Sequence, residues 1–444
     1  MIRIANGQGF WGDWLEAPVR LLEQGPLDYL TLDYLAEVTM SILQKQKQRD
    51  PALGYARDFP PLVARLERLV RARGVRVIAN AGGVNPVACA RQVRRLAPSL
   101  RVAVVVGDDV LDRMDEFLAK GYEMRNMDTG EPLAAVRSRI SSANVYLGAF
   151  PLAQALATGA DVVISGRCAD ASLALAPMIH EFGWGAHDWD LLAAGTVAGH
   201  IIECGAQVTG GNCQAGWQTI SDWADIGYPV LEVQPDGTFV VTKQPGTGGR
   251  VDQHTVKEQL LYEIADPRAY VTPDCVADFT TIRLEDCGPD RVRVSGVRGR
   301  PRTEFLKLSA SYAAGWKAVG TLVYSWPDAV GKAQTAARIV RERLERLGLR
   351  FDEIHTEILG AGACHGPAAA PAPDPPEVQL RIGVRGPDRA AVERFTRELI
   401  PLVLSGPPTA TGYGEGRPAV HEVIAFWPAL IPRHEIEPRV EVVE

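Results

Sequence analysis

The chain has 444 residues, of which 46% are apolar and 23% are charged, as is usual for a globular protein, and this length predicts two or three domains. Its net charge of −7 argues against nucleic acid as the main partner, and no apolar run reaches the about 20 residues that span a bilayer. The 7 widely spaced cysteines include no C-x-x-C pair, which indicates free thiols and a cytoplasmic location.

The first half of the chain alternates strand patterns with helical patterns. Strands are predicted at 2–6, 27–32, 75–79, 102–106 and 161–164, and helices at 15–24, 35–48, 59–73 and 147–158, with another starting at 85. This order predicts an α/β fold with a parallel sheet flanked by helices, in three Rossmann-like layers. A partial TIM-type barrel is the alternative, because five strands do not decide whether the sheet closes.

The second half of the chain is dominated by short β patterns. VLEVQPDGTFVVTK is typical of a hairpin with Asp236 and Gly237 in its turn. The Pro/Ala-rich stretch 363–376 is interpreted as a linker, and the β-α-β pattern that follows it predicts a small ferredoxin-like α+β domain. We therefore expect an N-terminal α/β domain at 1–215, an α+β domain at 216–365 and a small C-terminal domain at 377–444.

The strand at 161–164 leads into the turn Ser165, Gly166 and Arg167, and Asp170 follows three residues later. Ligands of open α/β sheets bind at the carboxyl ends of the parallel strands. An arginine beside glycine amides suits a carboxylate or phosphate, because the guanidinium group binds such anions bidentately. A structural ion pair between Arg167 and Asp170 is the alternative.

Acidic residues follow other predicted elements. Asp33 ends the second strand, and Glu203 ends an apolar helix with His200 on the same face. Because carboxylates exchange protons with carbon or water, we predict that Asp33, Asp170 and Glu203 are catalytic, although Asp33 could instead cap the next helix. No third ligand stands at metal spacing, so no metal site is predicted. The residues expected to bind substrate are Asn6, Gly9, Asn80, Gly82, Gly83, Ser165, Gly166, Arg167, Gly210, Gly211 and Asn212.

Three further acids are given structural interpretations. Glu37 is expected to lie solvated in the first turn of a helix, and Asp108 and Asp109 are expected to form a turn after the fourth strand.

The segment GQGFWG matches the dinucleotide pattern G-x-G-x-x-G through Gly7, Gly9 and Gly12. Asp33 follows about 20 residues later, where a ribose-binding acid is expected. The bulky Trp11 inside the motif argues against this interpretation. A glycine-rich turn that lets the backbone approach another ligand is the alternative.

A second glycine-rich turn, at 246–250, precedes a helix with a predicted capping box of Thr255 and Glu258. Helix N-termini attract phosphate, although this turn lacks the lysine of an NTPase loop and could be a plain loop. The predicted phosphate-binding residues are Gly246, Thr247, Gly248, Gly249 and Arg250.

Five segments resemble the acyclic terpene utilisation family AtuA: GFWGD, DYLTLDYLAEVTMSIL, GRCADASLALAPMIHEFGW, GHIIECGAQVTGGN and SGPPTATGYGEGRP. The similarity covers nearly the whole chain, including the small C-terminal α+β domain that such proteins carry. It implies a pathway in which branched acyclic terpenoids such as citronellol and geraniol become CoA thioesters and are carboxylated, hydrated and cleaved. For some relatives it also implies a small separate partner protein.

The leading hypothesis is a homo-oligomeric catabolic enzyme of hydratase or lyase type. It would act on a branched carboxylic acid or its CoA ester, with CoA present only as part of the substrate. The second hypothesis is an NAD(P)-dependent oxidoreductase that uses GQGFWG and Asp33. The third is a non-catalytic subunit that binds an acyl-CoA or a partner enzyme.

Overall fold

The structure is a computed structural model that describes residues 1–370, 374–412 and 416–444. It divides into two compact units. Unit 1 comprises Met1–Ser311 and Phe426–Glu444, and unit 2 comprises Tyr312–Ala425. Unit 2 is therefore an insertion in the chain of unit 1.

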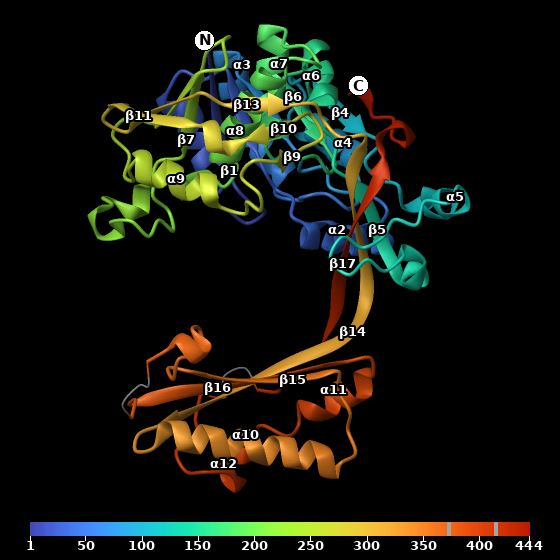
Figure 1. The fold of residues 1–444 in the computed structure, drawn as a ribbon, viewed down its shortest axis with the longest axis vertical. Coiled ribbons are helices and arrows are strands. Elements are labelled where there is room, and N and C mark those ends of the chain that lie inside the picture. Colours follow the sequence, from blue (N-terminus) through green and yellow to red (C-terminus); the bar gives the residue numbers. More distant parts are fainter. Residues whose placement is uncertain (371–373, 413–415) are drawn as a thin grey trace. The chain divides into compact units, whose positions relative to one another are not determined.

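Unit 1 is built on a mixed, ten-stranded sheet (Figure 1). Its strands, in order across the sheet, are β11 (Arg283–Gly288), β12 (Arg291–Ser295), β8 (Phe239–Lys243), β7 (Pro229–Val233), β1 (Ile2–Gln8), β2 (Tyr29–Leu32), β3 (Arg76–Ala79), β6 (Val162–Ser165), β4 (Val102–Val106) and β18 (Arg439–Val443). The strands from β1 to β4 in this order are parallel, and their neighbours on both sides are antiparallel. The sheet is open, with β11 and β18 at its edges, and is not a barrel.

The expected parallel sheet is thus only the middle of a larger mixed sheet. The predicted hairpin is present as β7 and β8, and β7 pairs with β1 through Val233 and Ile2. Strands on both sides of residue 215 therefore share one sheet. Sequence periodicity cannot show this pairing, because it joins segments that lie far apart in the chain. The three-domain division stays a prediction, and its borders differ from those of the two units.

Helices of unit 1 connect the strands and pack in two groups. They are α1 (Ala17–Gln24), α2 (Glu37–Arg49), α3 (Phe59–Arg73), α4 (Pro86–Leu96), α5 (Met114–Ala119), α6 (Ala149–Ala157), α7 (Ser172–Phe182), α8 (Trp189–Ile202) and α9 (Gln253–Leu261). Helix α3 packs against α1 and α4, and α7 packs against α6 and α8. Helix α3 shows why they pack: Leu62, Leu66 and Val70 recur on one face and are buried, and Gly74 ends the helix in a left-handed conformation at φ 66°.

Short strands complete unit 1. Strand β5 (Ile140–Val145) pairs with β14 (Phe305–Ser325), and a small sheet has the order β13 (Arg298–Arg300), β10 (Val276–Asp278) and β9 (Tyr270–Val271). The polar sequence ISSANV of β5 gives no strand signal, and this element was not expected. It places Tyr146 directly after its last residue.

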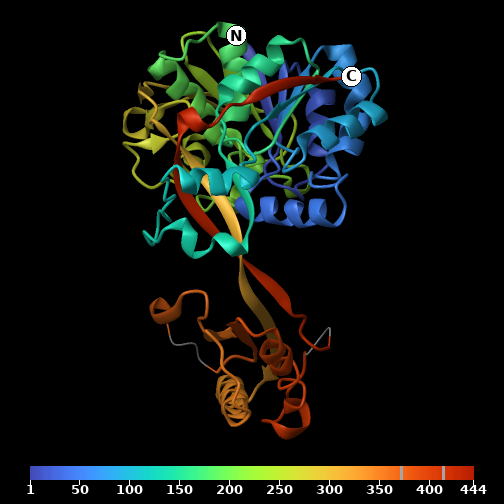
Figure 2. The same cartoon turned by 90° about the vertical axis from the view of Figure 1, so that its right-hand side faces the viewer.

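Unit 2 contains a sheet with the order β15 (Glu353–Leu359), β16 (Glu377–Gly386), β14 and β17 (His421–Pro432), together with α10 (Ala329–Arg346), α11 (Arg389–Phe395) and α12 (Leu402–Ser405). Helices α10 and α11 pack on β16. The stretch 363–376 therefore connects two strands of one sheet, and residues 371–373 lie outside the described residues. Residues 377–444, which were expected to form a separate C-terminal domain, contribute β16 and β17 to this sheet, to which β14 also belongs. Their last strand, β18, pairs instead with β4 in unit 1 (Figure 2).

Candidate functional site

Asp33 and Asn80 follow the neighbouring parallel strands β2 and β3 and meet at the carboxyl edge of the sheet. The Asn80 side-chain amide donates to Asp33 Oδ1 at 2.6 Å, and its oxygen accepts from the Tyr34 backbone N–H at 2.7 Å. Asp33 is 5% exposed and Asn80 is 0% exposed. Asn80, at the end of β3, thus holds the carboxylate of Asp33, at the end of β2, in a fixed orientation.

Arg167 follows β6 and is anchored from several sides. Its Nη1 donates to Asp170 Oδ1 and to the Leu35 carbonyl, each at 2.8 Å. Its guanidinium carbon lies 4.3 Å from the centre of the Tyr146 ring. Because Arg167 is 3% exposed and the Asp170 side chain 34%, a substrate has far more access to the carboxylate than to the guanidinium group.

Glu203 is placed by contacts from β1 and α8. Asn6 on β1 donates its side-chain amide to the carbonyls of Ile202 and Glu203, at 2.7 and 2.9 Å. His200 Nδ1 lies 3.0 Å from Glu203 Oε1, and the Glu203 side chain is 11% exposed. Asn6 therefore positions the end of α8. Both N–H groups of its side-chain amide are used in these bonds, so neither can donate to a substrate.

The three predicted catalytic carboxylates come close enough to affect one another. Burial and the Asp170 carboxylate raise the pKa of Asp33 well above its ordinary value, and Glu203 adds to this increase. Burial also raises the pKa of Asp170, against the charge of Arg167. Burial raises the pKa of Glu203, against His200, and Asp170 adds to the increase. We call Asp33, Asn80, Arg167, Asp170 and Glu203 the strand-end site.

Acidic groups with raised pKa values keep their protons to higher pH than ordinary carboxyl groups do, and can pass them to a bound molecule. Within residues 1–370, 374–412 and 416–444, no group of three or more His, Cys, Asp and Glu side chains has the arrangement of a metal site. The raised pKa values of Asp33, Asp170 and Glu203 suit these side chains to proton transfer.

Asp108 is a buried acid that the sequence interpretation treated as a turn residue. Its Oδ2 accepts from the Arg167 backbone N–H at 2.8 Å and from the Asn144 side chain at 2.9 Å. Burial raises its pKa to about 7. A Cβ at Gly166 would collide with this carboxylate, so the predicted substrate-binding glycine makes room for Asp108.

Glu37, Tyr146 and Lys307 form a second group beside Arg167. The Tyr146 hydroxyl donates to the Glu37 carboxylate, and Lys307 Nζ lies 3.5 Å from Glu37 Oε1. Lys307 Nζ is also 4.7 Å from the centre of the Tyr146 ring, so that this ring contacts two cations. Glu37 is thus paired rather than simply solvated. No spacing in the sequence links these three residues, because they lie on distant elements.

Several predicted substrate-binding residues have packing roles instead of free polar groups. The Gly82 N–H donates to the Ser165 carbonyl at 3.0 Å, and Gly83 has a left-handed φ of 53°. A Cβ at Gly9 would lie 2.7 Å from the carbonyl carbon of Cys204. These positions let strand-end loops approach one another closely, which positions the site.

The geometry of GQGFWG differs from that of a dinucleotide site. Gly7 lies inside β1, and α1 begins only at Ala17, so the helix does not follow the glycines directly. Gly9 faces the backbone of Cys204, where a pyrophosphate would need to approach. Asp33, the expected ribose ligand, accepts a hydrogen bond from Asn80.

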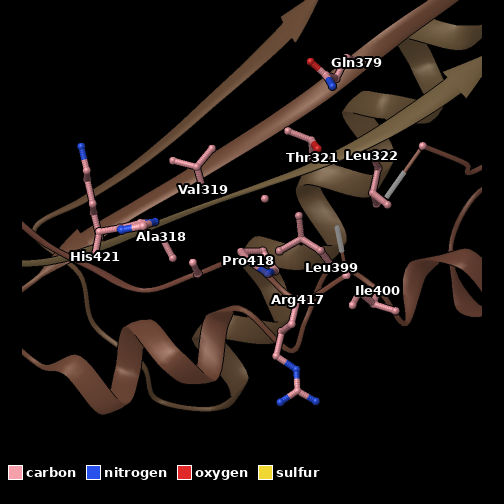
Figure 3. Close-up of a pocket in the computed structure, with 15 residues that line it drawn as sticks. Ala318, Val319, Thr321, Leu322, Gln379, Leu399, Ile400, Arg417, Pro418 and His421 are labelled. Carbon is pink, nitrogen blue, oxygen red and sulfur yellow. The ribbon is translucent and has the colours of Figure 1, made fainter. Parts of the chain in front are cut away.

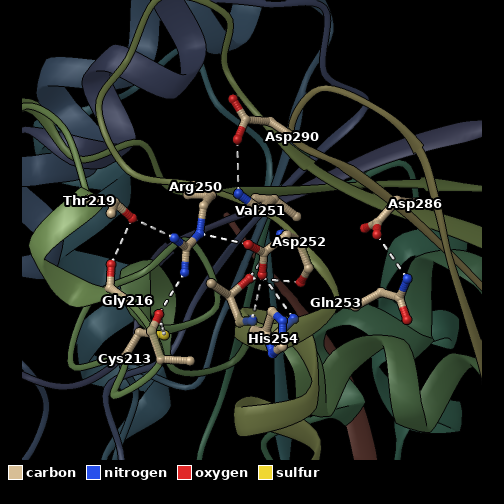
Figure 4. A network of polar contacts seen from close by, with 12 residues as sticks. Cys213, Gly216, Thr219, Arg250, Val251, Asp252, Gln253, His254, Asp286 and Asp290 are labelled. Carbon is tan, nitrogen blue, oxygen red and sulfur yellow. Dashed lines mark hydrogen bonds and ion pairs between the residues drawn. The ribbon is translucent and has the colours of Figure 1, made fainter.

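Arg250, one of the predicted phosphate-binding residues, lies in a separate network of polar contacts (Figure 4). Arg250 donates to Thr219 Oγ1 at 2.8 Å and to the Ala215 carbonyl at 2.7 Å, and its Nε lies 2.7 Å from Asp252 Oδ2. Asp252 in turn accepts from the N–H groups of His254 and Thr255 at the start of α9. We call Ala215, Thr219, Arg250, Asp252 and Thr255 the Arg250 network.

The Arg250 network already uses the groups that a phosphate would need. The N–H groups of Gly248, Gly249 and Arg250 donate to backbone carbonyls, the last of them to Thr209 at 2.7 Å. The capping box of α9 consists of Asp252 and Thr255, and not of Thr255 and Glu258 as predicted. Phosphate binding here stays a prediction that these contacts do not favour.

Gly210, Gly211 and Asn212 form a backbone turn that leads toward the Arg250 network. Gly210 and Gly211 donate to the carbonyls of Gln207 and Ala206, and Asn212 is exposed. None of these described contacts reaches the strand-end carboxylates.

Unit 2 contains a cavity of about 770 Å³. Lys317, Arg417 and His421 line it together with apolar side chains, and no Asp or Glu occurs among its described lining residues. Figure 3 shows His421 toward one end and Leu322 and Ile400 toward the other. This lining suits a molecule with an apolar part and an anionic group.

The fold and the site define a mixed α/β protein with an acidic site at the carboxyl edge of its parallel strands. The family model described as acyclic terpene utilisation family protein AtuA matches residues 2–442. The chain therefore belongs to this family, whose name refers to the catabolism of acyclic terpenes. No curated protein and no solved structure matches the chain. Over its described residues, no helix has both the length and the apolar character to cross a membrane.

Proposed function

We propose that the chain is a catabolic enzyme of hydratase or lyase type. Its substrate would be a branched, terpenoid-like carboxylic acid or the CoA thioester of such an acid. The observation that carries the proposal is the arrangement of Asp33, Asp170 and Glu203 around one buried edge of the sheet, beside Arg167. Hydration and elimination both require one group that takes a proton and another that gives one, and general acid–base catalysis typically contributes about 10²–10⁴-fold to the rate.

Arg167 has a supporting role in this proposal. Its positive charge opposes the rise in the pKa of Asp170 and lowers that of Glu37, which keeps anionic groups at the site. Asp170 is the most exposed of the three catalytic carboxylates, with 34% of its side chain accessible, and is the one that we expect a substrate to meet first.

The proposal is tested by measuring hydration of a methyl-branched 2-enoyl-CoA in the wild type, Glu203→Gln and Asp170→Asn. Glu285→Gln, a change of the same kind at an exposed position on β11, is the matched control. We expect turnover in the wild type and control and its loss in both site variants. Turnover that survives in both site variants would exclude this site.

An acyl-CoA-binding subunit without catalysis is the second candidate, because the cavity of unit 2 combines cationic and apolar side chains. It predicts that the wild type binds acyl-CoA without turnover and that the affinity is unchanged in Glu203→Gln. We also propose that the chain forms a homo-oligomer and binds a small partner protein. Native mass spectrometry tests both assemblies.

The oxidoreductase hypothesis is less favoured, since Gly9 packs on Cys204 where a cofactor would lie. A dinucleotide that stabilises the protein in a thermal-shift assay would restore it. A three-layer Rossmann-like arrangement of unit 1 and a ferredoxin-like C-terminal domain are likewise proposals about the fold, which an experimental structure would test.

A further inference from the structure

The two least exposed of the catalytic carboxylates have chemically different partners. Glu203 contacts an ionisable imidazole, with 3.0 Å between its Oε1 and His200 Nδ1. Asp33 Oδ1 accepts from two neutral donors, the Asn80 side chain at 2.6 Å and the Leu35 N–H at 3.2 Å. A basic partner favours the ionised form of a carboxylate more strongly than neutral donors do.

His200 has a single polar side-chain contact in the described structure, and this contact is Glu203. The residue is 1% exposed, and its Nε2 has no hydrogen-bond partner among the described residues. Its ring packs against the rings of Tyr270 and Phe279, with centroid distances of 5.3 and 5.5 Å. These aromatic contacts fix the imidazole so that Nδ1 faces the carboxylate.

The charges around this pair come from several elements. Asp170, from the β6–α7 loop, and Glu263, after α9, both oppose ionisation of Glu203. Gln259 on α9 donates to the His200 carbonyl at 3.1 Å and is neutral. Tyr270 on β9 and Cys204 next to Glu203 have pKa values that burial raises, so both are uncharged near neutral pH. His200 is therefore the basic group that faces Glu203 within this set.

Asp33 faces a different set of charges. Asp170 and Glu203 oppose its ionisation, while Asn80 and the more distant positive charge of Arg167 favour it. Its only close partners among the described residues are the neutral donors Asn80 and Leu35. Two carboxyl groups whose environments differ in this way can take opposite roles in one reaction.

We propose that His200 is a positioning residue that makes Glu203 the general base of the strand-end site and leaves Asp33 as its general acid. This assignment rests on the proposed hydratase or lyase function. In hydration, Glu203 takes a proton from water as the new C–O bond forms at one carbon of the double bond. Asp33 gives its proton to the neighbouring carbon, and solvent then removes the proton from Glu203 and returns one to Asp33.

His200→Asn tests the role of the imidazole, because asparagine can keep a donor near the position of Nδ1 but cannot carry a charge. We expect the acidic limb of the kcat/KM profile to move to higher pH by about one unit, which lowers kcat/KM about tenfold on that limb and little at high pH. In Asp33→Asn the basic limb should disappear. His187→Asn, an exposed histidine outside the site, is the control.

A second readout does not depend on turnover. Carbon-13 NMR of labelled glutamate should show Glu203 titrating at higher pH in His200→Asn than in the wild type. If Glu203 titrates at the same pH in both, the role of His200 is wrong, whatever the activity. If the shift occurs but no acyl-CoA is turned over, the pairing stands and the hydratase proposal fails.

Glu203→Gln gives the reciprocal measurement should His200→Asn not fold. Since the Glu203 carboxylate favours the charged imidazole, nitrogen-15 NMR should find His200 titrating at lower pH in this variant. An unchanged His200 titration would overturn the proposal.

Discussion

The strand-end site and the Arg250 network are two polar clusters of unit 1 with opposite electrostatic character. In the Arg250 network, Arg250 pairs with Asp252, which also caps α9, and the neighbouring amides donate to carbonyls. In the strand-end site, Asp33, Asp170 and Glu203 repel one another, and burial raises the pKa of each.

The difference supports a structural role for the Arg250 network and the proposed catalytic role for the strand-end site. Paired charges and capped helix ends lower the energy of the fold. Like charges held together in a buried place raise it, and proteins tolerate such arrangements mainly at functional sites. Residue type alone does not distinguish the two clusters, because both contain arginine and aspartate.

The largest effect is expected for Asp33→Asn. The substitution keeps the shape and removes a buried acid, so kcat/KM should fall about 10²–10⁴-fold while the protein stays folded. Asp286→Asn, at an exposed position near the Arg250 network, should retain full activity. Equal activity of the two variants would remove the functional distinction between the clusters.

Asp108→Asn should change the pH dependence of stability. The folded pKa of about 7 lies above the ordinary value of 3.8, so the stability that protonated Asp108 provides is complete below about pH 4 and is lost as the pH rises toward 7. The three-unit difference corresponds to about 4 kcal/mol. Urea unfolding at several pH values measures this difference. Between pH 4 and 7, the free energy of unfolding of the variant should rise relative to that of the wild type by up to this amount. A parallel pH dependence in both proteins would contradict it.

Arg167→Met should destabilise unit 1 by about 3 kcal/mol, because it leaves the Asp170 carboxylate without its cation. This value lies at the low end for buried pairs, since Asp170 is 34% exposed. The double variant Arg167→Met, Asp170→Asn should lose less than the single one, because no unpaired charge remains. Denaturant unfolding of both variants measures this coupling, and strictly additive losses would argue against it.

Asp252→Ala should have the smallest effect, about 1 kcal/mol from the lost helix cap. Its carboxylate accepts from the His254 and Thr255 N–H groups at 2.8 and 3.1 Å. Turnover should be unchanged. A loss of acyl-CoA binding in this variant would instead indicate that the Arg250 network binds the ligand.

The sequence predicted local elements well where their signals are local. Gly74 ends α3, and the turn at Gly237 joins β7 to β8, because glycine adopts the left-handed conformation that each position requires. The rule that ligands bind at strand ends predicts a site that includes Asp33 and Arg167, and both residues do follow parallel strands, β2 and β6. These inferences needed only neighbouring residues.

What the sequence could not predict depends on non-local pairing. Strand β5 has no apolar alternation, so Tyr146 and its contacts with Glu37 and Arg167 were not foreseen. Asp108 looked like a turn residue, because its burial depends on how β4, β5 and β6 come together. His200 was paired with Glu203 from helical spacing alone, but its aromatic surroundings come from β9 and the segment after β10.

The position of β18 has a consequence for how the protein is made. This strand pairs with β4 from Arg439 to Val443, although the long stretch of chain from residue 107 to residue 438 separates the two strands. During synthesis at about 5–20 residues per second, β4 is complete tens of seconds before its partner leaves the ribosome. An unpaired strand edge can recruit other chains in that interval, so the edge of β4 is open to aggregation until β18 has been made.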